Sequence, residues 1–289
     1  MKTTTTLREL IRRPEILVAP GAYDALSAKL IEAVGFEAVY MTGFGTAASI
    51  FGLPDIGLVT MTEMVENAKR MADAVNVPVI ADADTAYGNH LNALRTMEQY
   101  EKAGVAAIQI EDQISPKRCG HMDGHKLISV EDMAAKIRAA VTARRDQDMV
   151  LLARTDAISA EGFDEAIDRG NRYREEGADV IFVEAPTTVE QLEKIPKLIK
   201  GPVLVNVAPK TPYMHTKKYE EMGYAMAIYP AISLTVAYAA VRERLTELKR
   251  DGFMKSGAHG GVPFDELVDF LGLRKYRALE EKVLRGLAK

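Results

Sequence analysis

The chain has 289 residues, of which 47% are hydrophobic and 27% are charged, a balance typical of a globular protein with a substantial core. Its formal net charge is only -4, which gives no basic footprint for nucleic acid or for an anionic membrane surface. No apolar run approaches the length that spans a bilayer, and the N-terminal segment lacks the apolar core of a signal peptide. We therefore expect a soluble cytoplasmic protein with no nucleic-acid partner and no membrane association.

Short β-branched segments alternate with longer amphipathic segments along almost the whole chain. The predicted strands are residues 16–19, 37–42, 77–84, 106–112, 149–156, 178–184, 202–207 and 225–229. The predicted helices between them include residues 23–34, 62–75, 91–103, 130–144, 162–176 and 188–199. Eight such units in sequence favour a parallel sheet with right-handed crossovers, and eight strands close a (β/α)8 TIM-type barrel. No linker-like composition divides the chain, so we expect a single domain over residues 1–289.

The last part of the chain, residues 263–288, has apolar side chains at the spacing of an amphipathic helix. It lies beyond the eighth strand–helix unit, so we interpret it as a C-terminal helical extension of the barrel. Its apolar face has to be buried against something, and the sequence leaves two alternatives open. The extension packs on its own barrel, or it packs on a neighbouring subunit.

Charged or polar residues stand at the ends of five consecutive predicted strands that are otherwise apolar. These residues are Asp82 and Asp84, Glu111 and Asp112, Arg154 and Asp156, Glu184, and Asn206. The carboxyl ends of barrel strands face the mouth where barrel enzymes have their active sites. One such residue is more typical of a helix cap, but five strands in a row predict one polar site.

Asp82 and Asp84 have the i, i+2 spacing that places two side chains on the same face of a strand. Two carboxylates in one cavity repel each other unless a cation or a proton lies between them. With Glu111 on the next strand and Asp55 in the preceding loop, they form an all-oxygen set that suits Mg²⁺ or Mn²⁺. The alternative is a carboxylate pair that shares a proton without a metal. The histidines do not form a convincing zinc-binding cluster.

Cys119 is the single cysteine of the chain, so an intrachain disulfide is excluded and a reducing compartment is indicated. It is flanked by Lys117, Arg118 and His121, and nearby positive charge favours the thiolate over the thiol. A cysteine in this setting can exchange a proton near neutral pH. The alternative is a small, buried and inert side chain.

The segment from Thr42 to Ala48 follows the second predicted strand and matches the dinucleotide-binding pattern G-x-G-x-x-A. An NAD-binding oxidoreductase is therefore an alternative function of another class. However, Gly52 and Pro54 interrupt the helix that this pattern needs. We interpret the segment as a loop whose backbone N–H groups, with the Thr42 hydroxyl, bind a carboxylate.

Five motifs together resemble the isocitrate lyase/phosphoenolpyruvate mutase superfamily, and the resemblance runs through nearly the whole chain. They are Gly52-Leu53-Pro54-Asp55, Asp82-Ala83-Asp84, Glu111-Asp112-Gln113, Lys117-Arg118-Cys119-Gly120-His121 and Ala153-Arg154-Thr155-Asp156. The resemblance implies a (β/α)8 barrel, Mg²⁺, and a homotetramer whose C-terminal helices are exchanged between neighbours. It also implies a mobile loop around Cys119 that closes over a 2-hydroxy or 2-oxo dicarboxylic acid. The cysteine is typical of the carbon–carbon lyases of the superfamily, so we expect an oxo-acid lyase.

The resemblance also assigns functions to individual residues. Asp84 is expected to bind the metal directly, and Asp55, Asp82 and Glu111 are expected to bind it through water. The residues expected to hold the substrate are Thr42, Gly43, Phe44, Lys117, Gly120, His121, Arg154, Glu184 and Asn206. Cys119 is the expected general acid, Tyr40 is expected near the substrate hydroxyl, and Arg154 is expected to stabilise the oxygen at C2.

The identity of the substrate depends on two positions. In the 2-methylisocitrate lyases of the superfamily, an arginine follows the loop histidine, and a threonine stands two residues after the asparagine of strand seven. This chain has Met122 and Ala208 there. An unpaired third carboxylate would be costly to desolvate, so we expect (2R,3S)-2,3-dimethylmalate, split into pyruvate and propanoate. The alternatives are 2-methylisocitrate, split into pyruvate and succinate, and the hydrolysis of oxaloacetate.

Overall fold

The computed structural model describes residues 1–120, 124–257 and 260–287, and the chain forms two compact units, Met1–Thr235 and Val236–Lys289. The prediction of a single domain over residues 1–289 stays a prediction.

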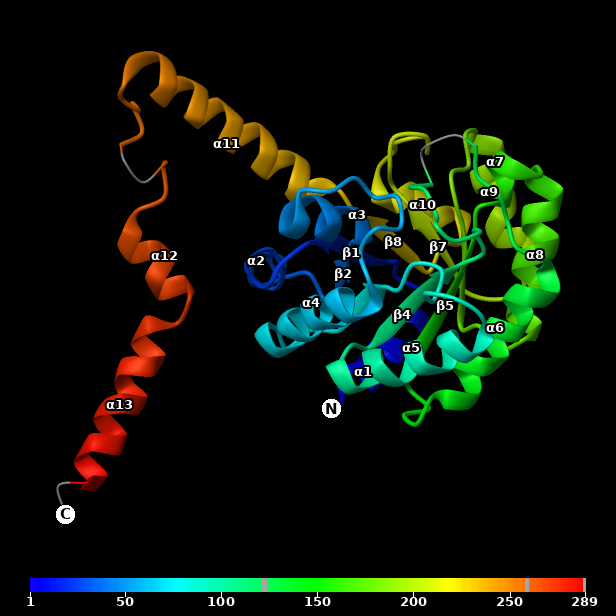
Figure 1. Cartoon of the computed structure of the whole chain (residues 1–289), viewed down its shortest axis with the longest axis horizontal. Coiled ribbons are helices and arrows are strands. Elements are labelled where there is room, and N and C mark those ends of the chain that lie inside the picture. The colour runs from blue at the N-terminus through cyan, green and yellow to red at the C-terminus, as the bar shows by residue number, and fades with distance from the viewer. Residues whose placement is uncertain (121–123, 258–259, 288–289) are drawn as a thin grey trace. The chain divides into compact units, whose positions relative to one another are not determined.

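The first unit is a closed barrel of eight parallel strands in the order β1 to β8 (Figure 1). The strands are β1 Leu17–Ala22, β2 Val39–Met41, β3 Val79–Asp82, β4 Ala107–Glu111, β5 Val150–Thr155, β6 Val180–Val183, β7 Val203–Asn206 and β8 Met226–Tyr229. All eight lie within the segments predicted from the sequence or differ from them by a few residues. The predicted TIM-type fold is therefore confirmed.

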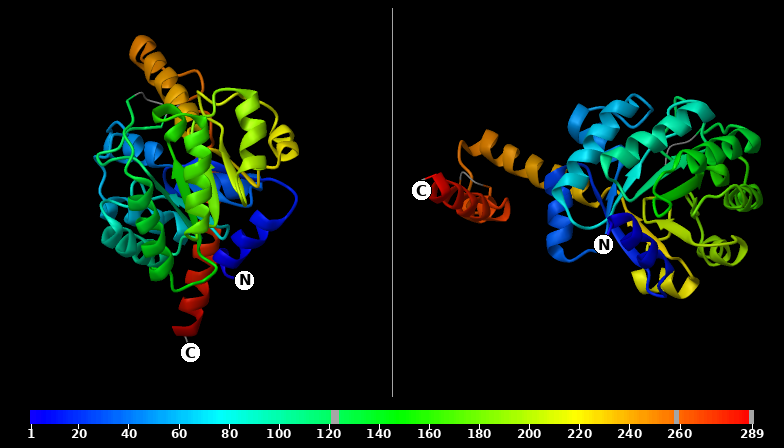
Figure 2. Two further views of the ribbon diagram at one scale, coloured as in Figure 1. Left: turned by 90° about the vertical axis from the view of Figure 1, so that its right-hand side faces the viewer. Right: turned by 90° about the horizontal axis from the view of Figure 1, so that it is seen from below.

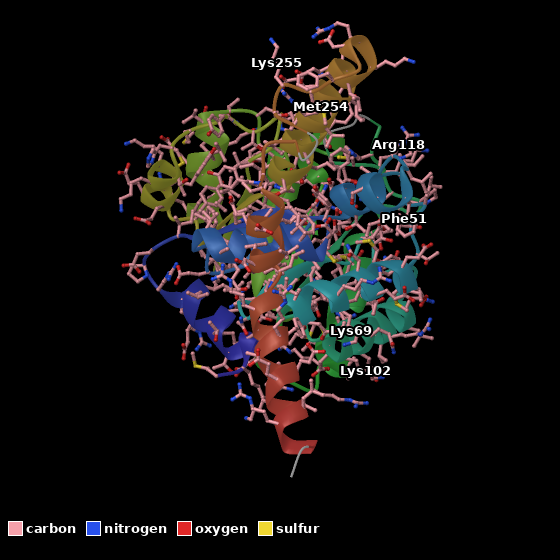
Figure 3. The ribbon with its side chains drawn as sticks, turned by 90° about the vertical axis from the view of Figure 1, so that its left-hand side faces the viewer. Phe51, Lys69, Lys102, Arg118, Met254 and Lys255 are labelled. Atoms are coloured by element: carbon pink, nitrogen blue, oxygen red, sulfur yellow. The ribbon has the colours of Figure 1, made fainter. Side chains whose placement is uncertain are left out.

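Helix α1 precedes the first strand, and the other helices follow the strands in sequence and surround the barrel on its outside (Figure 2). In the first unit they are α1 Thr3–Arg12, α2 Ala25–Val34, α3 Gly43–Thr46, the π-helix η1 Ala47–Phe51, α4 Met61–Ala74, α5 His90–Ala103, α6 Val130–Ala143, α7 Ala157–Ala160, α8 Phe163–Glu175, α9 Val189–Leu198 and α10 Thr216–Met222. Local sequence sets their ends. Thr60 and Glu63, for example, form a capping box at the start of α4, and Gly104 ends α5 with φ +87°. Lys69 of α4 and Lys102 of α5 lie on the exposed faces of these helices (Figure 3).

The core consists of two clusters that follow the alternation of side chains along the strands. An outer cluster, which includes Met41 and Ile108, packs between the strands and the surrounding helices. An inner cluster fills the barrel and includes Leu7 of α1 together with Leu152 of β5. Helix α1 lies at the amino ends of the strands, where Arg8 donates to the backbone carbonyl of Asp148. The barrel is thus closed at that end, which leaves the carboxyl ends of the strands for a site.

One strand is shorter than its sequence suggested. The predicted third strand runs to residue 84, but β3 ends at Asp82, and Asp84 lies in the following turn with φ +53°. The expectation that Asp82 and Asp84 share one face of a strand is therefore wrong. Asp84 lines the same hollow as Asp82, but a left-handed turn brings it there. The alternation of residues along a strand does not predict such a turn.

Helix α11 Ile232–Asp251 begins in the first unit and continues into the second, which also contains α12 Phe264–Phe270 and α13 Leu273–Leu287. Within the predicted extension of residues 263–288, α12 and α13 are helical, with a break at Gly272, where φ is +92°. Large apolar side chains on these helices are exposed, among them Leu245, Tyr276 and Val283. In the part of the chain that the structure describes, no helix is long and apolar enough to cross a membrane.

Candidate active site

Most of the predicted site residues line one cavity of about 290 Å³ at the carboxyl ends of the strands. They are Tyr40, Thr42, Phe44, Asp55, Asp82, Lys117, Cys119, Gly120, Arg154, Glu184 and Asn206. Gly43 and Asp84 line a small neighbouring hollow that shares Asp55 and Asp82 with the cavity. Glu111 is fully buried beside Arg154. His121 and Met122 lie outside the described residues.

The acidic residues of the site surround a buried ammonium group. Lys117 Nζ lies 2.7 Å from Asp55 Oδ1 and 3.7 Å from Asp84 Oδ2. Burial disfavours the charged form of Lys117, but Glu111, Asp55 and other carboxylates outweigh it and raise its pKa well above the usual value. Lys117 therefore remains a cation within the carboxylate cluster.

Glu111 is the most isolated carboxylate of the cluster. Within the described residues, neither of its oxygens accepts a hydrogen bond, although Arg154 Nη1 lies 3.4 Å from Oε2. Burial raises the pKa of Glu111 well above its usual value, against the opposing effect of Arg154. A buried carboxylate with unused lone pairs is a suitable acceptor for a proton or for the water shell of a cation.

The donor set fits Mg²⁺ or Mn²⁺ better than zinc. Among the described residues, no three or more His, Cys, Asp or Glu side chains are grouped so that they could hold a metal ion by themselves. Mg²⁺ does not need such a cage, because it keeps several waters and is held by one or two carboxylates together with a substrate. Asp84, with Asp55, Asp82 and Glu111 around it, offers hard oxygen ligands of this kind.

Arg154 of β5 is held by three carboxylates. Its Nε and Nη2 donate to Asp156 at 2.9 and 2.7 Å, while Nη1 lies 3.2 Å from Glu184 and 3.4 Å from Glu111. Burial disfavours its charge, but these carboxylates outweigh burial and raise the pKa of Arg154 well above its usual value. The guanidinium is thereby fixed in position and in charge, which suits it to bind a carboxylate or an oxyanion.

The segment after β2 differs both from the dinucleotide-binding pattern and from the predicted loop. It is helical from Gly43 onward, as α3 and then η1 with Thr42 as the N-cap, so the interpretation as a loop is wrong; the helical segment ends at Gly52, where the sequence indicated an interruption. Gly43 N donates to Asp82 Oδ2 at 3.1 Å, and Gly45 N donates to the Thr42 hydroxyl oxygen at 3.1 Å. The expected carboxylate is thus present at Gly43, but it is the protein's own Asp82. A Cβ at Gly43 would lie 2.4 Å from Asp82 Oδ2, so this approach requires glycine.

Tyr40 is buried inside the barrel mouth, and its hydroxyl donates to Gln109 Oε1 at 2.8 Å. Burial, followed by the negative charge of Asp82, raises the pKa of Tyr40 well above its usual value. Tyr40 is therefore a neutral phenol in this state. Gln109, which orients it, was missed in the sequence analysis because an internal glutamine in an apolar strand has no motif.

The segment with Cys119 is anchored on both sides of the thiol. Cys119 N donates to the backbone carbonyl of Asp55 at 3.1 Å, and the Cys119 carbonyl lies 3.1 Å from His125 Nε2. A Cβ at Gly120 would lie 2.1 Å from Arg154 Nη2, so the backbone passes directly against the guanidinium. Cys119 is half-buried and lines the cavity, whereas its neighbour Arg118 lies at the surface (Figure 3).

The cavity has an apolar side that sequence reasoning did not find, apart from Ala208. It is formed where β7 and β8 end, by Ala208, Pro209, Ile228, Pro230 and Ala231. The ring of Phe182 contributes as well and lies 5.2 Å from the Arg154 guanidinium carbon. Small apolar residues carry no chemical signature, so only the closure of the barrel identifies them as part of a site.

Known proteins with similar sequences cover nearly the whole chain. The family model of phosphoenolpyruvate phosphomutase matches residues 7–249. The 2,3-dimethylmalate lyase of Eubacterium barkeri is 46% identical over 288 residues, which cover 99% of this chain and 100% of that protein. The 2-methylisocitrate lyase of Aeropyrum pernix is 42% identical over 281 residues, which cover 96% and 90%. The predicted enzyme class, a carbon–carbon lyase, is confirmed.

Solved structures agree with this result. A crystal structure of 2,3-dimethylmalate lyase has a TM-score of 0.92 at 39% identity, covering 98% of this chain and 96% of that one. Oxaloacetate acetylhydrolase with 3,3-difluorooxalacetate has a TM-score of 0.93 at 36% identity, covering 98% and 97%. Phosphonopyruvate hydrolase with oxalate and Mg²⁺ has a TM-score of 0.90 at 31% identity, covering 98% and 100%. This chain therefore belongs to the phosphoenolpyruvate mutase/isocitrate lyase superfamily.

Proposed function

We propose that this protein is a Mg²⁺-dependent lyase, active also with Mn²⁺, that cleaves (2R,3S)-2,3-dimethylmalate into pyruvate and propanoate. The observation that carries the proposal is the division of the cavity into a charged side, with Lys117 and Arg154, and an apolar side at the ends of β7 and β8. A dicarboxylate with methyl substituents matches both sides. The 46% identity to a 2,3-dimethylmalate lyase over the full chain supports the same choice.

The charged side would hold the C1 carboxylate and the oxygen at C2. Arg154 is the central donor, and Thr42, Gly43 and Phe44 approach from the N-terminus of α3. Lys117, Gly120 and His121 would contribute from the Cys119 segment. At the other end of the substrate, Asn206 and Glu184 line the cavity as a hydrogen-bonded pair, with Asn206 Nδ2 donating to Glu184 Oε2 at 3.1 Å.

The metal would be held by Asp84 directly and by Asp55, Asp82 and Glu111 through water. Their oxygen chemistry and the unused lone pairs of Glu111 support this assignment, as does the Mg²⁺ bound to the related phosphonopyruvate hydrolase. When bound, the divalent cation supplies positive charge close to the C1 carboxylate and the C2 oxygen.

The reaction breaks the C2–C3 bond and moves two protons. The C2 hydroxyl gives its proton to a carboxylate of the site and becomes the carbonyl of pyruvate, while the bonding electron pair stays on C3 as an aci-carboxylate. Arg154 stabilises the oxygen at C2 as its charge develops. The Cys119 thiol then donates a proton to C3 and releases propanoate. Because this step needs a reduced thiol, we also propose a cytoplasmic location.

Ala208 favours a small substituent over a third carboxylate. A carboxymethyl group on this side of the cavity would meet Ala208, Pro209 and Ile228, which offer no side-chain donor, and Thr235, whose hydroxyl already donates to the Ala231 carbonyl at 2.9 Å. Desolvating a carboxylate without a partner is costly, whereas a methyl group is stabilised by burial. The 42% identity to a 2-methylisocitrate lyase makes 2-methylisocitrate the second candidate, and oxaloacetate is the third.

We further propose a homotetramer in which residues 263–288 are exchanged between neighbouring subunits. Contiguous apolar side chains normally mark an interaction surface, and α11 to α13 expose many of them. Those most relevant to such a surface are Val241, Leu245, Leu267, Tyr276, Leu279 and Val283.

The test is a pyruvate-release assay run in parallel on dimethylmalate, 2-methylisocitrate, isocitrate and oxaloacetate. We expect the highest kcat/KM with dimethylmalate. Stripping with EDTA is expected to abolish turnover, and Mg²⁺ or Mn²⁺, but not Zn²⁺, is expected to restore it. Higher kcat/KM with 2-methylisocitrate would overturn the substrate assignment, and full activity in EDTA would overturn the metal assignment.

A further inference from the structure

The turn that follows β3, residues 82–87, has a backbone that is unusual for its sequence. The φ angles of Asp84, Ala86 and Tyr87 are +53°, +62° and +57°. Aspartate tolerates this left-handed region, but alanine and tyrosine rarely adopt it because the Cβ atom crowds the backbone. Such a conformation persists only where the surrounding structure imposes it.

Hydrogen bonds to its backbone carbonyls hold the 82–87 turn in this conformation. Each backbone carbonyl from residue 82 to residue 86 accepts one. The donors, in order, are Tyr100 Oη at 3.0 Å, Ala86 N at 3.0 Å, Glu111 N at 3.0 Å, Lys136 Nζ at 2.9 Å and Thr96 Oγ1 at 3.2 Å. Three of the five donors are buried side chains of α5 and α6. We call Tyr100, Thr96 and Lys136 the turn clamp.

Tyr100 connects both ends of the turn. Because its own proton is donated to the Asp82 carbonyl, its oxygen accepts from the Tyr87 hydroxyl, 3.0 Å away. The Thr96 hydroxyl lies 3.2 Å from the Ala86 carbonyl and 3.5 Å from Met61 Sδ. A thioether is a weak acceptor, so the carbonyl is the stronger partner of Thr96.

We propose that the turn clamp positions Asp84 for cation binding by holding the 82–87 turn in its left-handed conformation. Asp84 Oδ1 already accepts from Thr85 N at 2.7 Å, so the turn also sets the direction of Oδ2. A carboxylate that is held in advance loses less freedom when it binds a cation. This inference rests on the proposed function, in which Asp84 binds the metal directly.

The first test measures Mn²⁺ binding to the full-length, EDTA-stripped protein by the electron paramagnetic resonance of free Mn²⁺, without substrate. Tyr100→Phe removes the hydroxyl that holds the Asp82 carbonyl and keeps the ring. We expect it to bind Mn²⁺ about three- to tenfold more weakly, the effect of one lost hydrogen bond. Tyr87→Phe removes the other hydroxyl of the pair and leaves the bond to Asp82, so we expect it to lose less Mn²⁺ affinity than Tyr100→Phe does.

Thr96 offers a second matched pair. Thr96→Val keeps the side-chain volume and removes the hydroxyl, whereas Thr96→Ser keeps the hydroxyl and removes a buried methyl group. If Thr96 acts through the Ala86 carbonyl, only Thr96→Val weakens Mn²⁺ binding, although both substitutions lower the melting temperature. If Thr96 only fills space, Thr96→Ser loses stability, Thr96→Val does not, and both bind Mn²⁺ normally, which overturns the proposal for Thr96.

Amide hydrogen exchange of peptides that contain residues 82–88 separates failure of the clamp from failure of the proposed metal site. The turn clamp predicts faster exchange in Tyr100→Phe and Thr96→Val than in their controls, in the absence of metal. If the unchanged protein does not bind Mn²⁺, the proposed metal site is wrong, and exchange alone decides whether the clamp holds the turn. If exchange and Mn²⁺ affinity are the same in all four variants, the clamp is refuted.

Discussion

Replacing Lys117 with methionine tests how the charges of the site are balanced before any metal binds. The substitution removes the ammonium that lies 2.7 Å from Asp55 and 3.7 Å from Asp84, but it keeps a long side chain in the same space. Lys117 is 4% exposed, so water does not replace the lost charge readily. We expect Lys117→Met to destabilise the metal-free protein strongly.

The size of the expected loss of stability follows from the distance between the charges. Two unit charges 2.7 Å apart attract each other by about 6 kcal/mol at an effective dielectric constant of about 20, and the desolvation of both groups offsets part of this. Removing one partner of a buried ion pair costs about 3–5 kcal/mol, because the other charge is left uncompensated. For a domain of this size, that corresponds to a melting temperature lower by roughly 6–20 °C.

The assay is thermal and urea unfolding of the EDTA-stripped protein, repeated with Mg²⁺. The control is Lys102→Met, the same substitution at an exposed lysine of α5 (Figure 3), which we expect to change stability by at most about 0.5 kcal/mol. If Mg²⁺ occupies the carboxylate cluster, it replaces the lost positive charge. The difference in unfolding free energy between Lys117→Met and the unchanged protein is then smaller with Mg²⁺ than in EDTA. Equal unfolding free energies of the two variants in EDTA would refute the idea that Lys117 balances the cluster.

Three further predictions concern the thiol, a peripheral carboxylate and the C-terminal extension. Cys119→Ser is expected to lower kcat by about 10²- to 10⁴-fold with little change in KM, because a hydroxyl is a far weaker acid than a thiol. Near-normal kcat on every substrate that undergoes carbon–carbon cleavage would contradict the lyase mechanism. Asp146 has a lowered pKa because hydrogen bonds from Asp148 N, Thr4 and Lys2 outweigh its burial. The unchanged protein is therefore expected to have a higher unfolding free energy than Asp146→Asn above about pH 4, and this difference is expected to disappear as the pH falls through the folded-state pKa. A difference in urea unfolding that does not change with pH would contradict this prediction. Deleting residues 263–289 is expected to dissociate the oligomer in sedimentation experiments, and a truncated chain that sediments as the same oligomer would favour packing of the extension on its own barrel.

The sequence predicted the barrel and the side chains at the strand ends because both depend on local patterns. Alternating apolar segments identify strands, and in a closed parallel barrel all carboxyl ends meet at one rim. Glu111, Arg154 and Asn206 were therefore found from their position alone. Lys117 was assigned to the substrate, whereas the structure brings it into the carboxylate cluster. That contact depends on how the segment after β4 crosses the rim, which no periodicity encodes.

The conformation of Asp84 and the apolar side of the cavity were beyond sequence reasoning for a different reason. The left-handed turn at Asp84 is imposed by side chains of α5 and α6; Thr96 follows Ala86 by 10 residues and Lys136 follows Thr85 by 51, so no local pattern connects them. Ala208 and Ile228 come together only because β7 and β8 are neighbours in the closed barrel. Tertiary contacts decide both features, and their residue types are equally common in ordinary loops and cores.

The charge of the site explains why a metal belongs to the proposed mechanism. The described side chains at the cavity and its edge include six carboxyl groups, Asp55, Asp82, Asp84, Glu111, Asp156 and Glu184, against the two cations Lys117 and Arg154. Burial raises the pKa of Asp82 and Glu111, which reduces the excess negative charge when these groups hold protons but does not reverse its sign. A dicarboxylate substrate would be repelled by such a site. A divalent cation between the carboxylates and the substrate would offset two of these negative charges and place positive charge next to the substrate, leaving Arg154 to act on the oxygen at C2 and Cys119 to protonate C3.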